Sequence, residues 1–82
     1  MANNVKYINC EKELTYHIQL LVSEINMMNH IIELLIAKKK LYTNKKDIVE
    51  WLNKIILNEI YCLNNTKMLF VMYLDQKYKL LK

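Results

Sequence analysis

The chain has 82 residues, a net charge of +4, and neither Gly nor Pro. A chain of this length has room for one small domain and buries only about 60% of the surface that its unfolded form exposes. The lack of Gly and Pro removes the usual residues of β-hairpins and phosphate-binding loops, which disfavours a β-rich fold. We therefore expect a single all-α domain over residues 1–82, completed by dimerisation.

All twelve basic residues are Lys, and the chain also has ten Asn and ten Ile. These residues have AT-rich codons, which favours an origin in a low-GC bacterium or in its phages or other mobile elements. The net charge could attract nucleic acid, but a small protein can carry such a charge for solubility alone. The opening MANNVK has no apolar core for a signal peptide, and no run of about 18 apolar residues occurs. We expect a cytoplasmic protein without a membrane span.

The strongest pattern is a heptad repeat in the first half of the chain. Apolar residues recur there at alternating four- and three-residue spacing, which is typical of knobs-into-holes helix packing. These seven residues, called the seam from here on, are Leu14, Ile18, Leu21, Ile25, Met28, Ile32 and Leu35. The β-branched members share one heptad position and the unbranched members share the other, as in two-stranded coiled coils. We predict a helix over residues 5–42, or from Glu11, whose seam forms a core or a dimer contact.

A turn is predicted at residues 42–45, where Thr43 or Asn44 can cap a second helix. That helix is predicted over residues 45–64. Its apolar residues recur at a spacing close to 3.6, and the side chains expected to be buried are Ile48, Leu52, Ile55, Ile56, Ile60 and Leu63.

Residues 64–66, with the sequence NNT, are weak helix formers and good caps. A short break is therefore favoured there, followed by a third helix over residues 67–81. The residues that continue a helical repeat in this last segment are Val71, Leu74, Tyr78 and Leu81. With the break, the chain forms a three-helix bundle. Without it, the chain is a helical hairpin that needs a second copy to complete a four-helix bundle.

The sequence predicts no catalytic, cofactor or metal site. Cys10 and His17 are two helical turns apart, about 10 Å, which is too far for one zinc ion even with Glu13 between them. Ser23 lies opposite the seam with no base or enclosing loop around it. We therefore expect a protein that is not an enzyme and has no small-molecule substrate.

Two features could contact a macromolecule. Trp51 is the candidate hot spot for a protein partner, because Trp dominates many interfaces. Five lysines gather around the predicted turn and could neutralise phosphates, namely Lys38, Lys39, Lys40, Lys45 and Lys46. The lack of Arg removes the commonest reader of guanine, so such binding would tolerate many sequences.

The expected function is that of a homodimeric helical interaction protein, which binds another protein as a regulator, inhibitor or adaptor. Inhibition of a host enzyme or defence system by a phage or mobile element is one form of this function. The alternative is a dimeric, sequence-tolerant nucleic-acid-binding protein that uses the lysine-rich turn.

Overall fold

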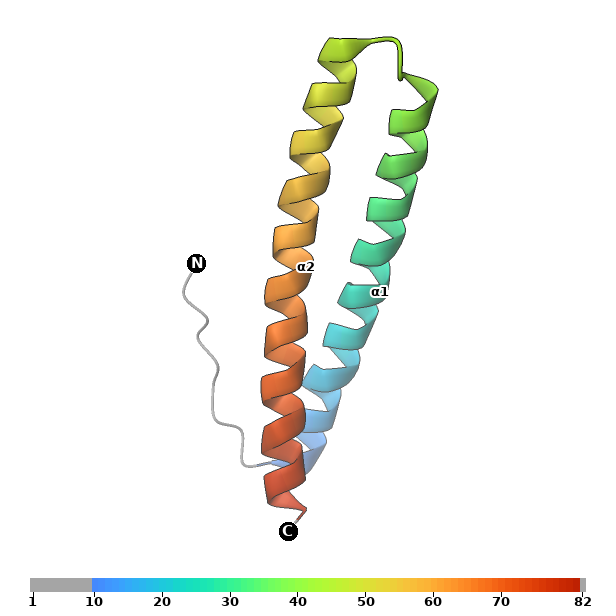
Figure 1. Ribbon diagram of the computed structural model, residues 1–82. Coiled ribbons are helices and arrows are strands. Elements are labelled where there is room, and N and C mark those ends of the chain that lie inside the picture. The colour runs from blue at the N-terminus through green and yellow to red at the C-terminus, as the bar shows by residue number, and fades with distance from the viewer. Residues whose placement is uncertain (1–9, 82) are drawn as a thin grey trace.

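The computed structural model describes residues 10–81, which form an antiparallel pair of long helices (Figure 1). Helix α1 spans Glu11–Leu41 and helix α2 spans Lys46–Leu80. No strand occurs among the described residues. The all-α prediction is confirmed, and the chain is a helical hairpin rather than a three-helix bundle.

Helix α1 begins at Glu11, one of the two predicted starts, and the stretch before residue 10 lies outside the described residues. Its first turn carries Glu11 and Glu13 and its last turn carries lysines, so charges at both ends complement the helix dipole. The predicted turn at residues 42–45 is confirmed. The N–H of Tyr42 donates to Lys39 O, and the N–H of Lys45 donates to Tyr42 O at 2.9 Å.

The predicted cap of the second helix is wrong. Neither Thr43 nor Asn44 is the N-cap of α2. Lys45 takes that position in an extended conformation, with no hydrogen bond from its side chain to the helix. Asp47 in the first turn supplies the negative charge that favours a helix N-terminus.

The predicted break at residues 64–66 is also wrong, because α2 continues through them. The Thr66 hydroxyl donates to the carbonyl oxygen of Cys62 at 2.9 Å, so it is satisfied within the helix. Thr66 and Leu63 are both buried, with 8% and 6% of their surface exposed. Because most helical stability in proteins comes from tertiary packing, this burial outweighs the weak helix propensity of the segment.

The seam of α1 faces α2 along its whole length. Leu14, Ile18 and Leu21 are buried, and the other four seam residues are half-buried. At the end where α1 begins and α2 ends, Leu14 and Ile18 form a core cluster. The half-buried residues of α2 packed against that cluster are Phe70, Tyr73 and Leu80.

The packing face of α2 follows a heptad repeat, not the predicted 3.6-residue repeat. Its buried and half-buried members are Val49, Leu52, Ile56, Glu59, Leu63, Thr66, Phe70, Tyr73, Lys77 and Leu80. Leu52, Ile56 and Leu63 are buried as predicted, and Ile48 and Ile55 are half-buried. Ile60 is exposed, however, because the heptad spacing places Glu59 toward α1 instead.

The helix predicted for the last segment of the chain is confirmed, as a part of α2. The predicted repeat residues Val71, Leu74, Tyr78 and Leu81 are all exposed. The apolar side chains that face α1 in this segment lie one position earlier, from Phe70 onward. The apolar repeat in the sequence is real, but it belongs to the outer surface of the hairpin.

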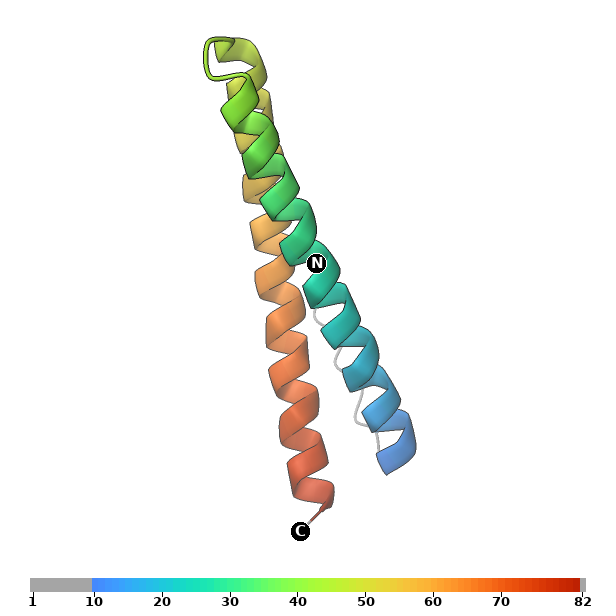
Figure 2. The same cartoon turned by 90° about the vertical axis from the view of Figure 1, so that its right-hand side faces the viewer.

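The hairpin is elongated, with extents of 56 × 21 × 15 Å. Its radius of gyration is 16.8 Å, whereas a compact domain of this length has a radius of about 12 Å. Figure 2 shows α1 inclined to α2, as Figure 1 does from the perpendicular direction, so the helices cross at an angle. Such an arrangement leaves most of the surface of each helix uncovered.

Candidate interaction surfaces

The hairpin buries few side chains for its apolar content. Among the described residues, six hydrophobic side chains and Thr66 are buried, while eighteen large hydrophobic side chains are exposed. Soluble monomers rarely expose contiguous apolar patches of more than a few hundred Å². Eleven of these eighteen side chains fall into two stripes, which their spacing along the helices defines.

The first stripe, called the Met27 face, runs beside the seam. On α1, exposed apolar residues recur at seven-residue intervals, with Ile31 between two of them. The exposed members are Leu20, Met27, Ile31, Leu34 and Leu41. Helix α2 adds half-buried residues one position before its own packing face, which are Ile48, Ile55 and Leu69.

Both helices contribute to this face for a geometric reason. Ile31 directly precedes the seam residue Ile32, and Ile55 directly precedes the packing residue Ile56. In an antiparallel helix pair, equivalent heptad positions next to the seam lie on the same side of the contact. The Met27 face is therefore a two-helix surface that runs along the hairpin.

The second stripe, called the Val71 face, lies on the opposite flank of the hairpin. Its exposed members are Leu57, Ile60, Val71, Leu74 and Tyr78 on α2, and Leu81, which directly follows the helix. Asn64 and Lys67 interrupt it, so the apolar part is densest in the last three turns of α2. This face belongs mainly to one helix, unlike the Met27 face.

The predicted lysine cluster does gather at the turn. Lys38, Lys39 and Lys40 occupy the last turn of α1, Lys45 precedes α2, and Lys46 begins it. Within residues 10–81, none of the five has a carboxylate oxygen within 4.0 Å, and the one lysine there that has such a partner is Lys79, beside Asp75. Trp51, the predicted hot spot, is 62% exposed near the same end of the hairpin. This end is a positively charged surface with an exposed aromatic residue beside it.

His17 has a role that the sequence did not predict. Its ring stacks on Tyr73 of α2, with ring centroids 6.0 Å apart and an interplanar angle of 21°. Its Nε2 lies 3.9 Å from Oε1 of Glu13. The described residues contain no group of three side chains that could hold a metal ion. His17 therefore contributes to helix packing, which could not be foreseen without knowing how the two helices align.

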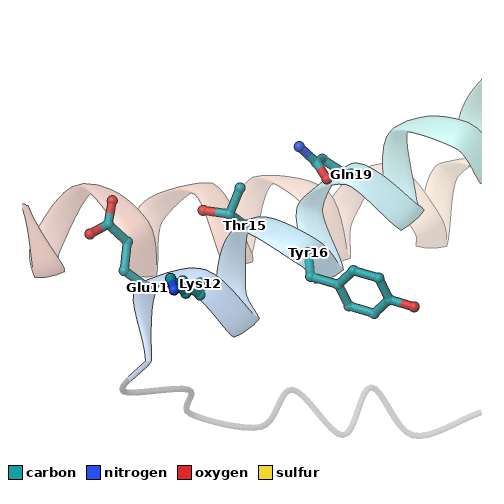
Figure 3. A pocket seen from close by; sticks show the side chains of 5 residues that line it. All are labelled: Glu11, Lys12, Thr15, Tyr16 and Gln19. Carbon is teal, nitrogen blue, oxygen red and sulfur yellow. The ribbon is translucent and has the colours of Figure 1, made fainter.

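A shallow hollow lies beside the first turns of α1. Figure 3 shows the side chains that line it, namely Glu11, Lys12, Thr15, Tyr16 and Gln19. They all come from one helix, and they diverge instead of converging on a point. One helical face cannot enclose a substrate, whereas ligand sites are concave and surround most of a bound molecule. The five described residues that line this hollow therefore do not by themselves enclose a ligand.

Helix α1 is the one described helix that is long and apolar enough to cross a membrane, by length and composition. Core helices of soluble proteins meet the same criterion. Glu24 and Glu33 lie within α1, and a charged side chain near the centre of a bilayer is costly. The absence of a membrane span stays a prediction from the sequence.

Comparisons of this chain with protein-family models, with curated proteins and with solved structures found no match. Function is therefore inferred from the surfaces of the hairpin itself.

Proposed function

We propose that this chain is a non-enzymatic interaction protein that binds another protein as a regulator, inhibitor or adaptor. The observation that carries the proposal is the excess of exposed over buried large hydrophobic side chains in the described residues. Exposed apolar surface arranged in stripes favours burial against another protein. Inhibition of a host enzyme or defence system, by a protein of phage or mobile-element origin, is one form of this function.

The Val71 face is the surface that we assign to the partner. Val71, Leu74 and Tyr78 have i, i+3 and i+7 spacing on one side of α2, and all three are exposed. This spacing is that of the anchors with which an amphipathic helix enters a hydrophobic groove or packs on another helix. The partner is thus expected to present an apolar groove or helix.

A matched pair of substitutions on α2 tests this proposal. Val71→Asp places a charge in the Val71 face, whereas Asn58→Asp places the same charge at an exposed position outside it. Affinity capture from a low-GC bacterial lysate, before and after phage infection, should be repeated after nuclease treatment and at raised salt. We expect a protein captured by the wild type and by Asn58→Asp under both treatments, but lost with Val71→Asp. Equal capture by all three chains would reject the Val71 face.

The second candidate function is nucleic-acid binding by the lysine turn. It is favoured by five lysines at one end of the hairpin, none with a carboxylate oxygen within 4.0 Å among the described residues. Each neutralised phosphate of a single strand changes the slope of log affinity against log salt by about −0.7. Five contacts would therefore give a slope of about −3.5.

Replacement of the five lysines by Gln tests this alternative. The variant carries Lys38→Gln, Lys39→Gln, Lys40→Gln, Lys45→Gln and Lys46→Gln. Loss of affinity for an oligonucleotide, together with loss of the salt slope, would support nucleic-acid binding at the turn. Unchanged affinity would remove this candidate function. It would not affect the separate test of the Val71 face by Val71→Asp.

A further inference from the structure

We propose that the Met27 face binds a second copy of this chain about a twofold axis that passes beside Ile31, perpendicular to the helices. The two hairpins then form an antiparallel four-helix bundle. Four-helix bundles use core positions from neighbouring helices, and a single hairpin supplies two of the four. The inference assigns a face and an orientation to the homodimer, and it does not depend on which molecule the Val71 face or the lysine turn binds.

The area of the Met27 face fits a dimer contact. Met27 is 65% exposed, Leu34 57% and Leu41 73%, with Leu20 and Ile31 at 43% and 37%. These five side chains expose roughly 600 Å² on each hairpin, and a standard interface buries about 800 Å² per partner. The half-buried Ile48, Ile55 and Leu69 of α2 border the same surface and would supply the remainder.

The spacing of this surface indicates helix packing. Together with two charged residues, its α1 members form a second heptad series at alternating four- and three-residue steps. The series is Leu20, Glu24, Met27, Ile31, Leu34, Lys38 and Leu41. Because this is the spacing of the seam itself, the surface suits another helix that packs along its length.

The charges in this series are complementary only in one orientation. Glu24 lies seven residues before Ile31 and Lys38 lies seven residues after it, on the same line of α1. A twofold axis beside Ile31 therefore brings Glu24 of each chain opposite the partner's Lys38. The same operation brings Met27, four residues before Ile31, close to the partner's Leu34, which lies three residues after it. An isologous contact repeats each pairing twice.

A parallel dimer would have the opposite electrostatics. It would place Glu24 near the partner's Glu24 and bring both five-lysine turns to one end. Juxtaposed like charges disfavour association. The antiparallel arrangement instead separates the two copies of Lys38 by 14 residues of helix, about 21 Å at 1.5 Å per residue.

Charge reversal tests both the face and the orientation. Glu24→Lys and Lys38→Glu should each raise the dimer dissociation constant by about tenfold or more, because each puts like charges together at both symmetric pairs. The double variant should restore the dissociation constant to near the wild-type value. Glu33→Lys, on the exposed side of α1 away from this series, is the control and should change it little. Sedimentation equilibrium of the full chain measures all five proteins.

Three results would overturn the proposal. The first is a wild-type chain that stays monomeric at about 100 µM, well above the micromolar range of weak specific interfaces. The second is a dimer that neither single reversal weakens. The third is a double variant as weak as the two single effects combined, which would exclude the antiparallel pairing.

A cross-link provides a second measurement that does not rely on charge. In a chain that carries Cys10→Ser and Cys62→Ser, Ile31→Cys places a thiol beside the twofold axis, within reach of the partner's own thiol. We expect a covalent dimer on mild oxidation. Ser23→Cys, at an exposed position on the opposite side of α1 from the seam, should remain monomeric under the same conditions. Equal cross-linking of the two variants would contradict the assignment of the face.

Discussion

Helix α1 carries two heptad series with the same spacing, and they differ in what covers them. The seam is buried or half-buried under α2, with Leu14 fully buried and Ile18 8% exposed. The second series, from Leu20 to Leu41, has its apolar members exposed within the hairpin. The difference shows that periodicity identifies a packing face, but the identity of the covering element depends on the rest of the fold.

The largest expected effect comes from a charge placed in the seam. Ile25→Asp puts a carboxylate in the packing face of α1 at a half-buried position. An uncompensated charge in a packing face is strongly destabilising. We expect loss of the helical circular dichroism signal. Asn26→Asp, at an exposed neighbouring position, should leave the signal intact. Loss of signal in both variants would show that the effect does not come from the packing of the seam.

A smaller but still large effect is expected from Leu14→Ala, because Leu14 is 0% exposed. Truncation of a buried Leu lowers the free energy of unfolding by about 2–5 kcal/mol. Leu20→Ala, in the second series, removes the same atoms from a side chain that is 43% exposed. Urea unfolding at low protein concentration should show a much smaller loss for Leu20→Ala. Equal losses would show that the two series are covered to a similar extent.

Substitution of Met27 separates association from folding. Met27→Asp should raise the dimer dissociation constant by at least about tenfold, as expected for an apolar side chain at the centre of an interface. Sedimentation equilibrium measures this change. Met68→Asp provides a control on α2, where Met68 is 47% exposed outside the Met27 face. An unchanged dissociation constant for Met27→Asp would show that the second series is not the dimer contact.

Thr66→Val tests what the Thr66 hydroxyl contributes to the packing face of α2. The Thr66 hydroxyl is buried and donates to Cys62 O, so its replacement by a methyl group removes one weak hydrogen bond and one buried polar group together. The Cys62 carbonyl oxygen stays within the helix, and the loss of a weak hydrogen bond is partly offset by the loss of a buried polar group. We expect the free energy of unfolding to change by less than about 1 kcal/mol. A larger loss in urea unfolding would mean that the hydroxyl itself maintains the helix at residues 64–66.

The smallest effect is expected for Asp75→Asn. Asp75 and Lys79 form an ion pair at 3.0 Å, but their side chains are 60% and 71% exposed. Exposed pairs at i, i+4 spacing contribute about 0.3–0.5 kcal/mol, and salt weakens them. Urea unfolding at low and high salt should show a small loss at low salt only.

The sequence predicted α1 and the turn well because the signals there agree with one another. An unbroken 4-3 repeat, lysines in the last turn and a polar stretch after them all indicate one helix followed by a turn. The lysine cluster followed directly from this turn, because residues on both sides of a short connection must lie close together.

The second half of the chain was harder to predict because α2 is apolar on more than one side. A repeat of 3.6 and a repeat of 3.5 diverge by only about 20° per heptad. Ile60 therefore seemed to belong to the face that Glu59 occupies. The NNT segment added a false boundary, since local propensity does not include the burial of Leu63 and Thr66. The stacking of His17 on Tyr73 depends on the alignment of two helices that the sequence does not specify.

The antiparallel connection also has a mechanical consequence. Helix α1 begins and α2 ends at the same end of the hairpin (Figure 1), so a force that separates Glu11 from Leu80 acts across the helices. The contacts then break one after another, from Leu14 and its neighbours toward the turn, as in the opening of a zipper. Pulling on the turn against this end would instead stretch both helices along their axes and would not pull them apart. The hairpin is therefore expected to resist a load along its long axis better than a load that pulls the start of α1 away from the end of α2.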